Sequence, residues 1–130
     1  MKLRKSTLLK NKELKLFKKG ILFFNKKEFY SAHEKWEELW TEYKLKDPKF
    51  IQGLIQLSVA FFHITNSNLI GSKNLFKKSL IKLELFSEFH ENINLSEIIF
   101  YSKKSLKLVD KINNVNQFDW KLAPKIIFKP

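Results

Sequence analysis

Apolar residues recur at helical spacing along most of the chain. The stripe nearest the start consists of Leu14, Phe17, Ile21 and Phe24. Spacing of three or four residues places side chains on one face of a helix, so a first helix is predicted to end near Phe24. Asn25 is then expected to cap a second helix over about residues 26–43, and Glu28, three residues further on, to complete a variant capping box.

Cap and turn residues predict the later helix boundaries. Asp47 followed by Pro48 indicates a helix start, with a cap and then proline at the first helical position, so a third helix is expected to run to about Thr65. The polar residues 66–68 predict a turn, and a fourth helix is expected over about 69–86. After a loop through His90 and Asn92, residues 94–130 are expected to form a fifth helix and an extended tail that docks on the bundle.

These elements predict an all-α fold. No useful stretch alternates as a strand would, and short connections favour antiparallel neighbours. We therefore expect a single helical domain over residues 1–130, a compact bundle of about five antiparallel helices. Laying residues 16–40 over 56–80 aligns small residues on both arms, Gly20 with Ala60 and Ala32 with Ser72, which resembles tetratricopeptide-like helical hairpins. Chance and duplication both explain so imperfect a repeat.

The composition is that of a folded globular domain. Hydrophobic residues make up 44% of the 130 residues, and there are three glycines and three prolines, which argues against disorder. The absence of cysteine excludes disulfides, thiol nucleophiles and cysteine-ligated metals. The chain begins with no apolar signal segment, and the uncharged stretch 51–72 holds too many polar residues for a transmembrane segment. By elimination, the expected location is the cytoplasm, or the plastid stroma if the gene belongs to a plastid.

The net charge of +12 is concentrated near the N-terminus. Residues 1–27 carry ten basic side chains against Glu13 alone. One interpretation is that the N-terminal lysines bind nucleic acid or anionic lipid, because lysines neutralise phosphates. Arg4 is the only arginine among the 25 basic residues, which disfavours base-specific recognition. The other interpretation is an AT-rich coding sequence, which would enrich Lys, Asn, Ile and Phe together.

Two polar stripes carry the candidate chemistry. In the second predicted helix the stripe consists of His33, Trp36, Glu37 and Trp40, and in the third it consists of Gln52, Gln56, Val59 and His63. Residues at these spacings share one face of a helix. In an antiparallel hairpin the two stripes could face each other inside an apolar shell.

The same residues carry a resemblance to a known family. The segments Phe24-Asn25, Glu28-Phe29-Tyr30, Ala32-His33-Glu34, Trp36-Glu37 and Trp40, followed by Gln52-Gly53-Leu54-Ile55-Gln56 and His63, resemble the domain-of-unknown-function family 309 over about residues 13–86. The resemblance implies a small all-helical bundle of uncharacterised biochemistry, found in bacteria, archaea and plastids, some members of which are described as predicted metal-dependent hydrolases. It marks as motif or ligand-pocket positions His33, Glu34, Trp36, Glu37, Trp40, Gln52, Gly53, Gln56 and His63.

Three interpretations of the polar cluster remain open. As a metal site, His33, Glu37 and His63 would hold one divalent metal that activates water for hydrolysis. As a metal-free catalytic pocket, His33 or Glu37 would act as acid or base, and Trp36 and Trp40 would stack on a flat or sugar-like ligand. In the third interpretation the cluster is structural and holds no cofactor. A buried hydrogen-bond network would then fix helix register, and its members would be the two histidines, Glu37 and the two glutamines.

The remaining candidates favour structural roles. Glu34 is expected in solvent or at a cap, and His90 is expected to be exposed in its loop. Gly53 is expected to allow close helix packing, and Trp120 to fill part of the protein's own core. The function expected first is therefore an interaction or scaffold module with a protein partner or a second copy of the chain, and a metal-dependent hydrolase is the alternative.

Overall fold

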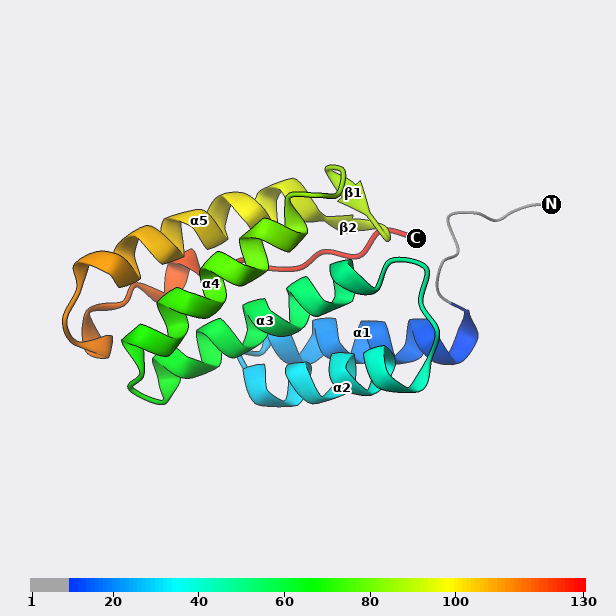
Figure 1. Ribbon diagram of the computed structural model, residues 1–130, viewed down its shortest axis with the longest axis horizontal. Coiled ribbons are helices and arrows are strands. Elements are labelled where there is room, and N and C mark those ends of the chain that lie inside the picture. The colour runs from blue at the N-terminus through cyan, green and yellow to red at the C-terminus, as the bar shows by residue number, and fades with distance from the viewer. Residues whose placement is uncertain (1–9) are drawn as a thin grey trace.

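The structure is a computed structural model that describes residues 10–130 (Figure 1). Five α-helices account for most of it: α1 (Asn11–Asn25), α2 (Phe29–Glu42), α3 (Pro48–Thr65), α4 (Leu69–Leu83) and α5 (Leu95–Lys111). The other elements are two short strands, β1 (Phe89–His90) and β2 (Ile93–Asn94), and two 3₁₀ turns, η1 (Val115–Gln117) and η2 (Trp120–Leu122). The all-α prediction is confirmed. No helix within residues 10–130 has the length and apolar character needed to cross a membrane.

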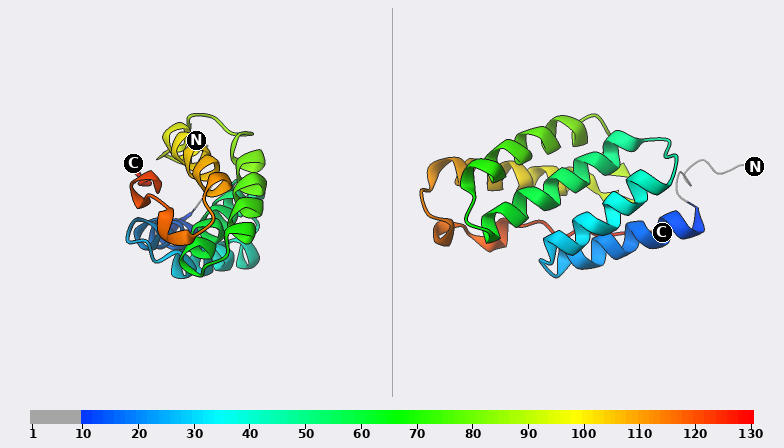
Figure 2. Two further views of the ribbon diagram at one scale, coloured as in Figure 1. Left: turned by 90° about the vertical axis from the view of Figure 1, so that its left-hand side faces the viewer. Right: turned by 60° about the horizontal axis from the view of Figure 1, so that its bottom comes forward.

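The helices form consecutive antiparallel neighbours. Helices α1 and α2 make one hairpin, α3 and α4 make a second, and α5 packs against α4 on the side away from α1 (Figures 1 and 2). Helix α3 lies between the two outer layers and is the most buried helix, with ten buried residues. The residues after α5 return along the bundle toward α1, so the C-terminal tail lies over the first and last helices (Figure 2).

Small residues let the helices of each hairpin approach closely. A Cβ added to Gly20 of α1 would lie 2.1 Å from Nε1 of Trp36 in α2, and that indole donates a hydrogen bond of 3.1 Å to the carbonyl of Phe17. In the second hairpin, a Cβ on Gly53 would lie 2.8 Å from a methyl carbon of Leu83. The close-packing role expected for Gly53 is therefore confirmed. The same overlay of residues 16–40 on 56–80 also aligns Phe17 with Leu57 and Trp36 with Phe76, and the residues of all four pairs are buried.

Most helix starts follow the prediction, but the cap at Asn25 is wrong. Helix α3 begins at Pro48, and Asn68 caps α4 by accepting a 2.8 Å hydrogen bond from the backbone N–H of Gly71. Asn25 is instead the last residue of α1, and α2 begins only at Phe29. The Asn25 side chain is bound elsewhere, because it donates to the carbonyl of Ile126 at 2.9 Å and accepts from its N–H at 2.8 Å.

The C-terminal tail completes the core, as expected. Phe118 and Ile126 are buried, and the Trp120 ring stacks on Phe29 at a centroid distance of 5.9 Å. Backbone pairing of Ile93 with Phe128 joins the tail to β2. The loop after α4 is therefore not open: residues 89–94 form a two-stranded hairpin that the tail holds against the bundle.

Candidate functional site

The motif on α2 separates into a buried and a partly exposed face. Trp36 is fully buried, whereas Trp40 is 37% exposed and Glu34 lies in solvent, as expected. Because Trp36 is enclosed between helices and bonded to Phe17, its ring cannot stack on a ligand. The aromatic platform of the metal-free pocket hypothesis is thus missing one of its two rings.

The predicted polar residues do not meet across the α2–α3 hairpin. Among residues 10–130, the polar partners of His33 lie on its own helix: Nδ1 lies 3.1 Å from the carbonyl of Tyr30, and Nε2 lies 3.9 Å from Oε2 of Glu37. Gln56 of α3 accepts a 3.0 Å hydrogen bond from Lys82 of α4, and His63 lies 3.5 Å from the amide nitrogen of Asn68.

The expectation of a single buried network is therefore wrong. The five residues of the expected network are all partly exposed: His33, Glu37, Gln52, Gln56 and His63. Their hydrogen-bond partners lie in three separate parts of the structure, namely Tyr30, Asn68 and Lys82. The stripes turn toward the edges of the hairpin because the apolar residues beside them fill the interface. Within the described residues, His33, Glu37 and His63 are not brought together as a ligand group. Hydrolysis at these residues stays a prediction.

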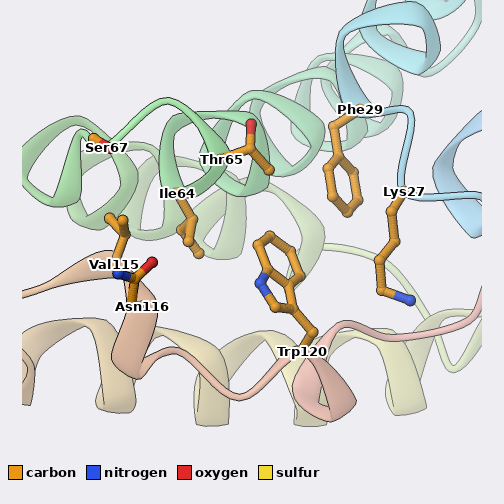
Figure 3. A pocket seen from close by; sticks show the side chains of 8 residues that line it. All are labelled: Lys27, Phe29, Ile64, Thr65, Ser67, Val115, Asn116 and Trp120. Carbon is orange, nitrogen blue, oxygen red and sulfur yellow. The ribbon is translucent and has the colours of Figure 1, made fainter.

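A ligand-sized cavity lies between the tail and the first two hairpins. It has a volume of about 410 Å³ and is lined by Lys27, Phe29, Ile64, Thr65, Ser67, Val115, Asn116 and Trp120 (Figure 3). Trp120 and Phe29 form an aromatic wall, and Lys27 supplies the one titratable group of the lining. A lone lysine without a neighbouring acid or base suits binding better than acid–base chemistry.

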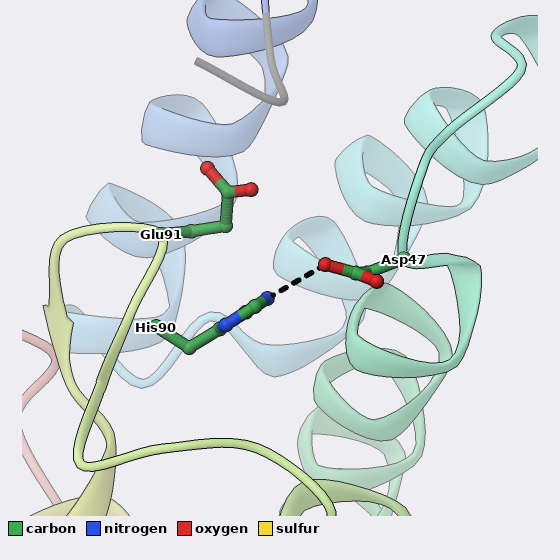
Figure 4. Close-up of side chains that lie close together, drawn as sticks. All are labelled: Asp47, His90 and Glu91. Atoms are coloured by element: carbon green, nitrogen blue, oxygen red, sulfur yellow. Dashed lines mark hydrogen bonds and ion pairs between the residues drawn. The ribbon is translucent and has the colours of Figure 1, made fainter. Parts of the chain in front are cut away.

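Three chemistry-bearing residues do cluster, at the start of α3 and in the turn between β1 and β2. Asp47, His90 and Glu91 each offer one ligand atom, and these atoms lie within 4.8 Å of one another (Figure 4). His90 Nε2 donates a 3.1 Å hydrogen bond to Oδ2 of Asp47, and the imidazole packs against Phe50 and Phe86. His90 is thus half-buried, and the expectation that it is simply exposed is wrong. We call these three residues the Asp47–His90–Glu91 cluster.

Burial perturbs the titration of this cluster. Burial, together with the nearby charge of Asp47, raises the pKa of the Glu91 carboxyl to about 7. Burial also lowers the pKa of the His90 imidazole, against the opposing effect of Asp47. Near neutral pH, His90 is therefore mostly uncharged and Glu91 is partly protonated.

A different surface, formed by α4 and α5, combines lysines with exposed apolar side chains. We define the basic face as the following exposed residues of α4, α5 and the turn after α4: Ile70, Lys77, Lys78, Ile81, Leu85, Phe100, Lys104, Lys107 and Lys111. Ion pairs across the two helices, Lys73 with Asp110 at 2.5 Å and Lys103 with Glu84 at 2.6 Å, hold their outer faces side by side. Within residues 10–130, the lysines of the basic face take part in no ion pair.

Helix α2, in the other outer layer of the bundle, carries the opposite charge. Helix α2 presents the exposed carboxylates of Glu34, Glu38 and Glu42, whereas α4 holds four lysines and no acidic residue. At the edge of the basic face, its residues Lys104, Lys107 and Lys111 surround a hollow of about 230 Å³ whose apolar lining is Leu108 and Leu122. The basic charge is therefore not confined to the N-terminal segment that the sequence emphasised, part of which (residues 1–9) lies outside the described residues.

Comparison with known proteins supports the resemblance seen in the motifs. The family model described as Domain of unknown function (DUF309) matches residues 17–75. We call these matched residues the DUF309 segment. This segment runs from the middle of α1 into α4 and contains His33, Glu37 and His63, but it ends before β1, α5 and the tail.

One relative extends beyond the DUF309 segment. An uncharacterized protein of Aquifex aeolicus (strain VF5) is 30% identical over 97 residues, which cover 74% of this chain and 29% of the relative. The chain therefore spans less than a third of the length of that relative. No solved structure matches the chain.

The sequence alone did not reveal the Asp47–His90–Glu91 cluster. Asp47 was expected as a helix cap, but its side chain accepts no hydrogen bond from the helix and turns to His90, 43 residues away along the chain. Only Asp47 of the three belongs to the DUF309 segment. The one available signal was the pair of polar residues His90 and Glu91 in a short loop after a helix.

Proposed function

We propose that the protein is an interaction module that binds an acidic, amphipathic segment of a partner protein on the basic face. The observation that carries this proposal is the alternation of lysines with large exposed hydrophobic residues. Ile70 is 78% exposed, Ile81 69% and Phe100 54%. Large apolar side chains that are this exposed and are surrounded by charges of one sign are typical of surfaces that bind other proteins.

The apolar residues favour a protein partner over nucleic acid. Lysines alone would suffice to bind phosphates, and exposed isoleucines add nothing to that contact. An acidic amphipathic helix uses both features, because its carboxylates meet the lysines while its apolar face covers Ile81 and Phe100. Lys104 already lies over the Phe100 ring, 5.1 Å from its centroid, so charge and apolar surface are presented together.

Charge argues against a second copy of the chain as the partner. The acidic face of α2 complements the basic face, but each copy carries a net charge of +12. Two such copies repel each other at distances up to about a Debye length, roughly 8 Å at physiological salt. An acidic partner meets attraction over the same range. The longer Aquifex relative, of which the matching segment is 29%, is consistent with a module joined to other segments.

A designed peptide tests the proposal. The probe is a fluorescently labelled helical peptide with glutamates on one face and leucines at i, i+3 and i+4 spacing on the other, compared with a scrambled peptide of the same composition. Fluorescence anisotropy should show binding of the amphipathic peptide to the full chain. Ile81→Ser and Phe100→Ser should each weaken binding about tenfold, which corresponds to the loss of about 1.4 kcal/mol of apolar burial.

Matched variants elsewhere on the surface serve as controls. Leu22→Ser removes a hydrophobic side chain of α1 that is 53% exposed, and Lys44→Glu reverses an exposed charge beyond α2. Both should bind the peptide as the parent does, whereas Lys104→Glu should bind it weakly. Equal binding of the scrambled peptide would refute the proposal. Preferential binding of duplex DNA would point to the nucleic-acid alternative, and dimerisation in sedimentation that Lys104→Glu abolishes would point to self-association.

A further inference from the structure

The Asp47–His90–Glu91 cluster contains an oxygen atom that nothing in the protein binds. Oε2 of Glu91 is buried and has no hydrogen-bond partner. Such an atom is costly, because an unpaired buried acceptor loses its contacts with water and gains none in return. Within the described residues, only three buried side-chain atoms share this condition, and the other two are serine hydroxyls.

The groups around Glu91 favour a cation as the partner of its carboxylate. Its ligand atom lies within 4.8 Å of those of His90 and Asp47, so two carboxylates face one another across a small space. No lysine or arginine is paired with either carboxylate in residues 10–130; Asp47 binds only His90. A cation between the three side chains would give the Glu91 carboxylate a partner and offset the repulsion of the two carboxylates.

We infer that the Asp47–His90–Glu91 cluster binds one divalent transition-metal cation of the zinc class. A histidine nitrogen with two carboxylate oxygens suits Zn²⁺ or Mn²⁺, whereas Mg²⁺ and Ca²⁺ prefer oxygen ligands alone. Three protein ligands leave at least one coordination position for water. The residues differ from the His33, Glu37 and His63 set that the motif suggested, and two of them lie outside the DUF309 segment.

The position of the site gives the cation a structural consequence. Asp47 adjoins the first turn of α3, and His90 and Glu91 lie in the β1–β2 hairpin. The adjoining Asn92 carbonyl accepts a 2.8 Å hydrogen bond from the Lys129 N–H. A cation bound here therefore ties the start of α3 to the hairpin, and through the hairpin to the C-terminal tail.

Titration with zinc tests this inference without reference to any activity. The untagged full chain is freed of metal with EDTA, exchanged into buffer at pH 7 and titrated with ZnCl₂ in a calorimeter. We expect saturable binding of one equivalent. Glu91→Gln and Asp47→Asn should each weaken binding at least about tenfold, since even residues outside the ligand shell cost 10- to 100-fold when changed. Glu88→Gln, in the same loop, and His33→Ala should leave the affinity unchanged.

Histidine ring resonances provide a measurement that needs no variant. The chain has three histidines, so their ring signals can be assigned and followed as zinc is added. Zinc should shift His90 and leave His33 and His63 in place. The inference is overturned if zinc shows no saturable binding, if Glu91→Gln and Asp47→Asn bind it as the parent does, or if His33 and His63 shift instead of His90.

Discussion

Gly20→Ala tests the close contact between α1 and α2. The added Cβ would lie 2.1 Å from Nε1, 2.4 Å from Cε2 and 2.5 Å from Cδ1 of Trp36. Real carbon atoms need more than 3 Å, so the indole must move by about 1 Å within a packed core. The same movement would stretch the 3.1 Å hydrogen bond from Trp36 to the Phe17 carbonyl.

These effects oppose the intrinsic preference of helices for alanine. Overpacking costs about 1–3 kcal/mol, and loss of a buried hydrogen bond adds about 1–3 kcal/mol. Replacing glycine by alanine within a helix stabilises the helix by roughly 1 kcal/mol. The free energy of unfolding should therefore fall by about 1–5 kcal/mol. Gly53→Ala should cost less, because the nearest atom, 2.8 Å away, is a methyl carbon of Leu83 that can rotate.

Urea denaturation followed by circular dichroism at 222 nm measures both changes. A double-mutant cycle identifies the cause: Trp36→Phe removes the nitrogen-bearing ring, so Gly20→Ala should cost less than about 1 kcal/mol in that background. If Gly20→Ala raises stability by about 1 kcal/mol, or destabilises both backgrounds equally, the contact with the indole does not limit the packing and the reasoning fails.

Three further predictions concern the tail, the Glu91 carboxyl and the tryptophans. Asn25→Ala should cost about 1–3 kcal/mol and speed amide exchange at Ile126, because Asn25 makes two hydrogen bonds to that backbone; unchanged exchange would contradict this. In EDTA, the stability of the parent relative to Glu91→Gln should fall as pH rises from about 4.5 to about 7, since the folded state keeps a proton that the unfolded state releases near 4.5; a flat difference between the denaturation curves would refute it. Trp36→Ala should cost roughly 3–5 kcal/mol and Trp40→Ala much less, because Trp36 is fully buried and Trp40 is 37% exposed; equal losses in urea titrations would be inconsistent with this packing.

The sequence predicted the helices well because their signals are local. Pro48 fixes the backbone at the first turn of α3, and Asn68 accepts the hydrogen bond that starts α4. The prediction for Asn25 was wrong because its partner is distant in sequence. An asparagine before a helix is a common cap, but here the side chain binds the backbone of Ile126, 101 residues further along the chain. Local patterns contain no information about such a partner.

The candidate chemistry was harder to predict for a geometric reason. Spacing shows that His33 and Glu37 share a face of α2 and that Gln56 and His63 share a face of α3, but not how each helix is rotated about its axis. The rotation is set by the apolar residues, and it turns Gln56 toward Lys82 of α4. The Asp47–His90–Glu91 cluster forms because two loops meet in space, and the spacing of hydrophobic residues does not predict which loops meet.

The docked tail has a consequence for how the chain folds. The two helical hairpins bring together residues close in sequence, so they can form while later residues are still being synthesised. The contacts of Ile126 with Asn25 and of Phe128 with Ile93 close much longer loops, which costs more chain entropy. Until Phe118 and Trp120 have left the ribosome and docked, the rings of Phe29 and Phe61 lack part of their cover. The nascent chain therefore passes through a stage in which formed hairpins expose aromatic surface, and docking of the tail ends that exposure.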